Sequence, residues 1–206
     1  MLNRKRYSEV MSKPYHHGSL RPELIRLGEL EIASAGLQYF GLREVARKAG
    51  VSSAAAFRHF ANKDDLVRAI AAEGFRALIE SLSQGDALPP ERKLRAGFEA
   101  YLQFAVDRPG CLRAMFGGIL ERSEPECEAV TLSTAAFAWL EGAVREGQNS
   151  RLLRDAGPGT ALVFFSALHG AALLHLEMGT FPSVGPLTPG ELADLLFDTL
   201  IKGLTP

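Results

Sequence analysis

The sequence predicts an all-α protein in which an N-terminal helix-turn-helix domain joins a larger helical domain. Three observations predict this fold. Apolar residues recur at helical spacing along the chain, whereas the alternation typical of a strand persists for only a few residues. Helix start and stop signals separate these segments. Residues 42–60, LREVARKAGVSSAAAFRHF, have the pattern of two short helices joined by a tight turn.

The chain begins with a polar, basic segment that precedes the first helix. Residues 1–14 contain four Lys or Arg residues, and two interpretations of them remain open. The segment is either a disordered tail, with Met11 as an alternative start, or an arm that contacts phosphates or a minor groove. The first helix is expected from Pro22 to Ala35, because proline suits a first helical turn and Gly36 can end the helix.

The next two helices form the helix-turn-helix pattern. Apolar residues from Leu42 to Ala49 recur at helical spacing, and Gly50 supplies the backbone freedom that a sharp turn needs. Ser52 is placed to cap a second helix that ends near His59. The outward positions of this second helix are small, hydroxylic or basic, so the helix can approach the edges of bases closely. Double-stranded DNA is therefore the leading partner.

The remainder of the chain also reads as helices. Asn62 is expected to cap a fourth helix that reaches Leu82, and a loop is expected over 83–90. Further helices are expected over residues 91–107, 110–120, 125–147, 158–178 and 188–202. The last of these begins with a capping box, Thr188 to Glu191.

The longest apolar stretch, residues 161–176, predicts a buried helix. It contains Ser, Gly and two His residues, and a membrane span requires a longer and less polar run. We therefore expect no contact with a membrane. Residues 1–14 do not resemble a signal peptide, and the two cysteines lack metal or redox spacing, so a protein of the reducing cytoplasm is expected.

The charges of the chain are distributed unevenly. Residues 1–63 contain eleven Lys or Arg against five Asp or Glu, a net charge of +6. The remaining residues carry a net charge of −7, so the whole chain carries only −1. A basic N-terminal third localises attraction for polyanions to one end of the protein. This asymmetry supports the prediction of DNA binding, although alone it would describe a solvated surface equally well.

Several motifs together resemble the TetR family of bacterial transcriptional regulators. They are YHHGSLR at 15–21, the helix that ends at Gly36, LREVARKAGVS at 42–52, FRHF at 57–60 and NKDDL at 62–66. The first motif resembles one subgroup, and FSALHG at 165–170 resembles a Trp-x-x-x-His-Gly signature with Phe165 in the place of Trp. The resemblance implies a DNA-binding head (15–66) and an effector-binding, dimerising body (67–206), which follow the flexible basic arm expected over residues 1–14.

The resemblance also implies a set of DNA contacts on the head. Ser52 and Lys63 would hold phosphates, and Arg43 would bind the flanking backbone. The full expected set is Arg43, Ser52, Ser53, Ala54, Ala55, Phe57, Arg58, His59 and Lys63, of which Ser53, Ala54, Ala55 and Arg58 lie nearest to bases.

Two positions depart from the family pattern. Phe57 replaces the usual Tyr, and Gly41 replaces the usual Ser or Thr, which removes a helix cap. Each loss predicts a backbone contact weaker by about 1 kcal/mol. Phe57 could instead belong entirely to the core, and His59 could only pack at a helix end.

For the body, the resemblance implies a small-molecule effector and a homodimer. Candidate effector contacts are Phe98, Tyr101, Leu102, Met115, Phe116, Phe137, Trp139, Phe165 and His169. Each could instead fill the core, and His169 could be a hydrogen-bonded core histidine. The dimer is expected through two helical stripes, Ala161, Phe165, Leu168, Ala172 and Leu176 on one helix and Leu192, Leu195, Leu196 and Leu200 on the last. The alternative is that both stripes face only their own domain.

Enzymatic functions receive little support from the sequence. It lacks a phosphate-binding GxxxxGK[ST] loop, a GxSxG elbow, an HExxH helix and a CxxC pair, so no catalytic residue, metal site or cofactor is predicted. The adjacent His16 and His17 lack an evident third ligand. The expected function is a ligand-responsive repressor that binds a palindromic operator as a homodimer. The alternatives are a helical protein-interaction module and a small enzyme.

Overall fold

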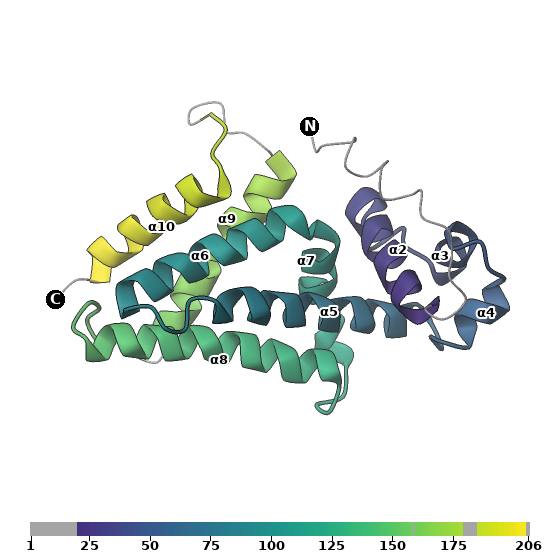
Figure 1. Ribbon diagram of the computed structural model, residues 1–206, viewed down its shortest axis with the longest axis horizontal. Coiled ribbons are helices and arrows are strands. Elements are labelled where there is room, and N and C mark those ends of the chain that lie inside the picture. The colour runs from purple at the N-terminus through teal and green to yellow at the C-terminus, as the bar shows by residue number, and fades with distance from the viewer. Residues whose placement is uncertain (1–19, 158, 179–184, 205–206) are drawn as a thin grey trace.

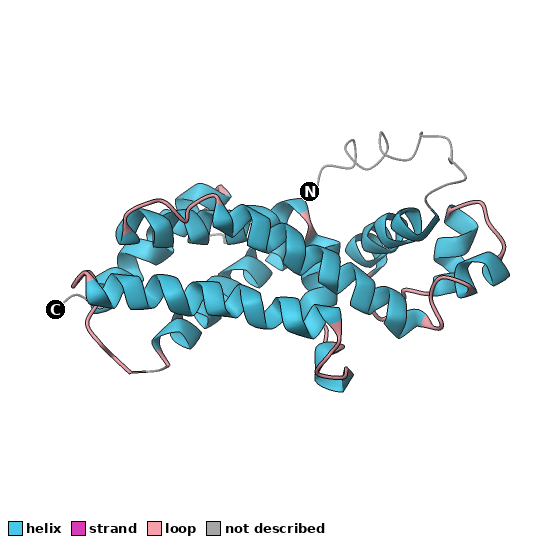
Figure 2. Ribbon diagram, turned by 60° about the horizontal axis from the view of Figure 1, so that its bottom comes forward, coloured by secondary structure: helices cyan, strands magenta, loops and turns pink. Residues whose placement is uncertain are grey.

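The computed structural model describes residues 20–157, 159–178 and 185–204. The regular elements in these ranges are helices joined by loops, which confirms the predicted fold class (Figure 2). The basic segment 1–14 and residues 15–19 of the YHHGSLR motif lie outside the described residues. The roles expected for them therefore stay predictions.

The head lies at one end of the molecule (Figure 1). It consists of α2 (Leu20–Ala35), α3 (Leu42–Lys48), α4 (Ser53–Phe57) and the start of α5 (Lys63–Ser83). Leu24, Val45 and Leu66 are fully buried between these helices. Each comes from a different helix, so the small domain folds around one shared core.

Local signals define the turn between α3 and α4. Gly50 adopts a φ of 69°, in the left-handed region that favours glycine. The amide of Val51 donates to the carbonyl of Ala46 at 3.0 Å, which closes the end of α3. The hydroxyl of Ser52 then accepts a hydrogen bond from the amide of Ala55 at 3.2 Å and caps α4. The predicted turn and cap are confirmed.

Helix α5 leaves the head and forms part of the body. Asn62 caps it as predicted, because its side chain accepts a hydrogen bond from the amide of Asp65 at 2.9 Å. The helix then continues to Ser83 and packs against α7 and α8. The predicted boundary between residues 66 and 67 therefore falls inside a continuous helix.

The body is a bundle of helices around the second half of α5. It contains α6 (Pro90–Asp107), α7 (Pro109–Phe116), a 3₁₀ turn (Leu120–Arg122), α8 (Glu128–Asn149), α9 (Thr160–Met178) and α10 (Pro189–Leu204). In Figure 1, α5 runs between α6 and α8, and α10 lies along α6 on the outer side. The capping box of α10 is present, since the amide of Glu191 donates to the hydroxyl of Thr188 at 3.2 Å and Glu191 accepts from the Thr188 amide at 2.8 Å.

Helix α7 is shorter than expected and connects the body to the head. The predicted helix 110–120 ends at Phe116, because two glycines follow and Gly118 adopts a φ of 76°. The guanidinium of Arg108 forms two hydrogen bonds with the carboxylate of Glu29, at 2.5 and 2.7 Å. Arg113 donates to the backbone carbonyl of Ala33 at 2.8 Å. Both acceptors lie on α2, so these hydrogen bonds hold α7 against the head.

The structure corrects the prediction for residues 161–176. The window Thr160–Glu177 is long and apolar enough, by length and composition alone, to cross a membrane, and only 28% of it is buried inside the protein. One such helix is weak evidence for a membrane span, since core helices of soluble proteins pass the same test. Helix α9 packs against α6, α8 and α10, and the prediction of a buried helix is wrong for most of this window.

The face of α9 that remains exposed differs from the predicted dimer stripe. Leu162, Val163, Leu173 and Leu174 are between 38% and 56% exposed. The expected stripe faces its own domain instead: Ala161, Leu168 and Ala172 are buried, and Phe165 and Leu176 pack against the core. On α10, Leu192, Leu196 and Leu200 also pack against the core, whereas Leu195 is 55% exposed.

Candidate functional site

Helix α4 presents most of its expected DNA contacts to solvent. Ser52, Ala54, Arg58 and His59 are exposed, and Ser53 is half-buried. Ser52 uses its hydroxyl oxygen as a cap acceptor, which leaves the hydroxyl hydrogen to donate to a phosphate. The short helix therefore offers small, polar and basic groups along one outer surface of the head.

Two nearby residues of the expected set, Ala55 and Phe57, differ in burial. Ala55 is only 9% exposed and, with the fully buried Ala56, faces the core of the head. The structure therefore removes Ala55 from the expected base-contacting set. Phe57 is 43% exposed, so the alternative that it belongs entirely to the core is wrong. Its ring offers an apolar surface beside Arg58 but no hydroxyl for a phosphate.

The two basic residues expected to flank α4 are placed differently. Arg43 lies exposed in the first turn of α3. Lys63 is half-buried, and its ammonium donates to the carbonyl of Leu37 at 2.8 Å and lies 5.8 Å from the centre of the Phe40 ring. Lys63 thus joins the loop before α3 to the start of α5. Gly41 provides no side-chain cap for α3, as its identity predicted.

Acidic residues neutralise several other cations of the head. Ion pairs join Arg26 to Glu23, Arg47 to Glu44, Lys48 to Glu31 and Arg68 to Asp65. Within the described ranges, Arg43 and Arg58 form no such pair. These two exposed arginines are therefore available to an external anion.

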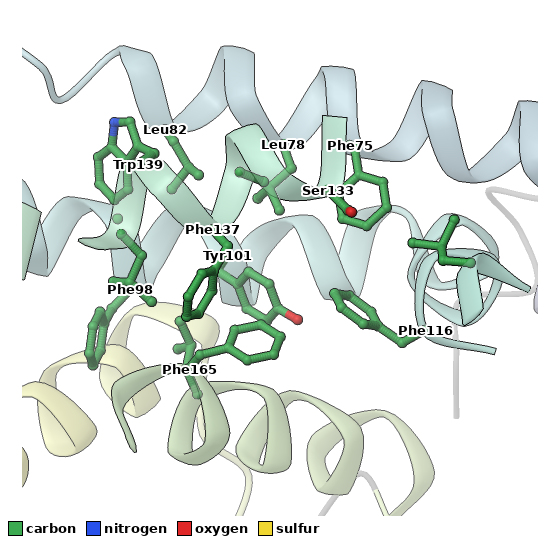
Figure 3. A pocket seen from close by; sticks show the side chains of 15 residues that line it. Phe75, Leu78, Leu82, Phe98, Tyr101, Phe116, Ser133, Phe137, Trp139 and Phe165 are labelled. Atoms are coloured by element: carbon green, nitrogen blue, oxygen red, sulfur yellow. The ribbon is translucent and has the colours of Figure 1, made fainter. Parts of the chain in front are cut away.

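The body contains a cavity of about 230 Å³ between α5, α6, α8 and α9 (Figure 3). Its walls are almost entirely apolar and largely aromatic. The lining residues are Phe75, Leu78, Leu82, Gly97, Phe98, Tyr101, Phe116, Leu120, Ser133, Ala136, Phe137, Trp139, Leu140, Phe165 and Leu168. Apolar cavities of this kind are typical of small-molecule sites.

The ring of Phe165 lies at the centre of an aromatic group in this wall. It packs edge to face against Tyr101 and Phe137, with ring centres 6.1 Å apart in both pairs, and lies 5.7 Å from Phe116. Edge-to-face geometry of this kind is favourable for aromatic pairs. The ring also stacks on His169 at 5.4 Å. Residues from α6, α7, α8 and α9 thus meet around one side chain.

His169 touches the cavity through Tyr101 rather than directly. The hydroxyl of Tyr101 and Nδ1 of His169 are 2.7 Å apart. Burial raises the pKa of the Tyr101 phenol and lowers the pKa of the His169 imidazole. Both groups are therefore neutral near pH 7, and the pair is a hydrogen bond between uncharged side chains.

Most of the effector contacts expected from the sequence lie in the cavity wall. These are Phe98, Tyr101, Phe116, Phe137, Trp139 and Phe165. Leu102 and Met115 are buried outside the wall, and the sulfur of Met115 lies close against Gly74 of α5. Both therefore stay core residues, as the alternative interpretation allowed.

The wall that α5 contributes was not predicted from the sequence. Phe75, Leu78 and Leu82 recur at helical spacing on the second half of this helix. That stripe is visible in the sequence, but none of these three residues was among the expected effector contacts. No group of His, Cys, Asp or Glu that could hold a metal ion occurs in residues 20–157, 159–178 and 185–204.

Comparisons with known proteins agree with both parts of this architecture. Residues 25–70 match the family model of bacterial regulatory proteins of the tetR family, and residues 94–200 match that of the tetracyclin repressor-like C-terminal domain. No curated protein sequence matches the chain. The fold and the exposed helix α4, which is the recognition helix of the helix-turn-helix, define the class as a helix-turn-helix transcriptional regulator. The second match covers more than half of the chain, so the chain belongs to the TetR family.

Solved structures with the same fold include three informative examples. A protein of unknown function from Rhodococcus sp. RHA1 is 30% identical, with a TM-score of 0.74, and the match covers 95% of this chain and 100% of that one. PfmR, a TetR family transcriptional regulator from Thermus thermophilus, is 19% identical, with a TM-score of 0.72 and coverage of 89% and 99%. AibR, solved with isovaleryl coenzyme A and operator DNA, is 19% identical, with a TM-score of 0.70 and coverage of 88% and 97%.

Proposed function

We propose that this regulator is a cytoplasmic, ligand-responsive repressor that binds a palindromic operator as a homodimer. The observation that carries the proposal is the pairing of two sites in one chain. One is an exposed recognition helix flanked by two arginines that have no ion pair among the described residues, and the other is an apolar cavity in the adjoining domain. The structure of AibR with both a small molecule and operator DNA supports a regulator that combines the two.

The proposed DNA contact set is centred on α4. Ala54 and Ser53 approach base edges, Arg58 contacts a base or phosphate, and Arg43 holds the flanking backbone. Ser52, Phe57, His59 and Lys63 complete the set near the sugar-phosphate chain. Ala55 is excluded from the set because it is buried.

The dimer is proposed through the exposed apolar face of α9. Leu162, Val163, Leu173 and Leu174 line this face, and Leu195 of α10 adds to the apolar surface of the two helices. Contiguous exposed apolar surface is typical of protein interaction sites. A second copy of the chain would cover this face and pair two heads, as recognition of two half-sites requires.

Selection of bound fragments from the source genome, followed by anisotropy titrations, tests the proposal. Selected fragments are expected to share an inverted repeat, and their affinity is expected to fall steeply as salt rises. Transcription from a linked promoter should rise when the regulator is deleted. Failure to retain any fragment at low salt would contradict DNA binding, and reduced transcription on deletion would make the protein an activator.

A further inference from the structure

The cavity wall contains no group that carries a formal charge. None of its lining residues is an Asp, Glu, Lys, Arg or His. Its polar side chains are Tyr101, Ser133 and Trp139. The chemistry of a molecule that fits this space therefore depends on how these three side chains are already engaged.

Each of the three polar side chains already has a partner in the protein. The hydroxyl of Ser133 donates to the carbonyl of Val130 at 2.8 Å. The indole of Trp139 donates to the carboxylate of Asp86 at 2.8 Å. The hydroxyl of Tyr101 is hydrogen-bonded to Nδ1 of His169 and lies among the aromatic rings of the wall (Figure 3). A bound molecule thus finds few hydrogen-bonding positions, and the oxygen of Tyr101 is the most central.

Three cations on the helices around the cavity have acidic partners. Lys93 lies 5.8 Å from the centre of the Trp139 ring, and its ammonium pairs with Glu146 at 3.0 Å. On the neighbouring helices, Arg95 pairs with two aspartates of α10, and Arg113 pairs with Glu177 at 2.8 Å. A carboxylate or phosphate inside the cavity would therefore find no cationic partner in the wall. Burial of an unpaired charge is strongly unfavourable.

The volume sets the size of the molecule. An apolar protein cavity of roughly 150 Å³ holds one benzene ring, and the present cavity measures about 230 Å³. Scaling between the two gives a molecule of about nine non-hydrogen atoms. We propose that the cavity takes an uncharged, predominantly apolar molecule of this size with at most one or two polar groups, and that it rejects carboxylates and coenzyme A thioesters. This inference rests on the proposal that the cavity is the effector site.

An uncharged effector would distinguish this chain from AibR, which was solved with isovaleryl coenzyme A. A coenzyme A thioester carries phosphates, which proteins hold with Arg, Lys or helix N-termini. The wall described here has no such cation among its lining residues. The same fold would then bind a charged molecule in AibR and an uncharged one in this chain.

Matched probes of one chain length test the inference directly. Octan-1-ol and octanoate contain the same number of carbon atoms, and they differ in charge at neutral pH. Trp139 is the single tryptophan of the sequence and lines the cavity, so its fluorescence reports binding, with calorimetry as a second measurement. Octan-1-ol is expected to bind saturably, and octanoate at least about 100-fold more weakly, because of its buried charge.

Two variants move the preference in defined directions. Ala136→Phe fills the cavity and should abolish saturable binding of octan-1-ol. Ser133→Lys places a cation in the wall and should strengthen octanoate binding by about tenfold or more while weakening that of octan-1-ol. Circular dichroism and thermal unfolding identify a variant that fails to fold, and the comparison of the two probes on the parent protein does not depend on either variant.

The outcomes distinguish this inference from the proposed function. Octanoate that binds as tightly as octan-1-ol overturns the inference, as does an absence of octan-1-ol binding up to its solubility limit. Unchanged octan-1-ol binding to folded Ala136→Phe also overturns it. Operator affinity is measured by anisotropy with and without octan-1-ol. If octan-1-ol occupies the cavity and octanoate does not, but operator affinity stays constant, the inference stands and the effector role of the cavity fails.

Discussion

The head and the body bury apolar side chains in the same way but expose different chemistry. The head exposes small and basic residues on α4 and α3, and Ser52 caps the short helix α4. The body turns aromatic side chains inward around a cavity and leaves an apolar face of α9 outside. The head thus presents surface that can bind an anion, whereas the body has apolar surface, inside and outside, that can bind an apolar partner.

The largest expected effect concerns the outer apolar surface of the body. Val163→Asp combined with Leu174→Asp places two charges on the exposed face of α9 and should yield a monomer by sedimentation equilibrium. Operator affinity should fall by more than about 100-fold, because one head reaches only one half-site. Thr131→Asp adds a charge to an exposed position of α8 and is the matched control. A double variant that remains dimeric would place the interface elsewhere.

A smaller effect is expected on the exposed surface of the head. Arg58→Ala should weaken binding to the selected operator by about 5- to 150-fold if the guanidinium reads a base, and should relax the sequence preference. Anisotropy titrations with the operator and with mismatched DNA measure both quantities. Arg145→Ala removes an exposed arginine from α8 in the body and should leave both unchanged. An unchanged preference in Arg58→Ala would remove this residue from the base-reading set.

The junction between the regions is expected to tolerate little added volume. A Cβ at Gly110 of α7 would lie 2.1 Å from the carbonyl oxygen of Glu29 on α2, whereas a Cβ at Gly142 of α8 would meet no atom within 4 Å. Gly110→Ala should therefore lower the free energy of unfolding by about 1–3 kcal/mol. Gly142→Ala should raise it by about 0.5–1 kcal/mol. Chemical denaturation measures both, and equal effects would contradict the close approach of α7 to α2.

The smallest expected effect is a pH dependence inside the body. Burial lowers the pKa of His169 in the folded state, so the unfolded chain binds a proton first as pH falls. Stability from this group is therefore complete above the unfolded pKa of about 6.5 and is lost as pH falls below it. Thermal unfolding between pH 7.5 and 5.5 should show a weaker pH dependence in His169→Gln than in the parent. An identical dependence in both proteins would assign it to other groups.

The sequence could predict features that depend on a few adjacent residues. The turn at Gly50, the caps at Ser52 and Asn62 and the capping box at Thr188 are all present, because each is a local hydrogen-bond pattern. The identity of Gly41 likewise predicted an uncapped α3. Local rules therefore described the head well.

Which face of a helix is buried was harder to predict, because it depends on distant neighbours. Helix α4 spans only five residues, so periodicity could not separate the buried Ala55 from the exposed Phe57. Helix α9 is apolar on most sides, and its sequence did not reveal which stripe would meet the rest of the body. Leu102 and Met115 are apolar neighbours of cavity residues, and only packing placed them behind the wall.

Helix α5 belongs to both the head and the body. It begins in the head at Lys63, and its later turns supply Phe75, Leu78 and Leu82 to the cavity. Its 21 residues extend roughly 30 Å, so a tilt of about 5° about one end displaces the other by roughly 3 Å. That displacement is about the length of a hydrogen bond. A bound molecule that tilts α5 by a few degrees would thus move the arginines of the head away from the major groove of DNA, while every helical turn stays intact.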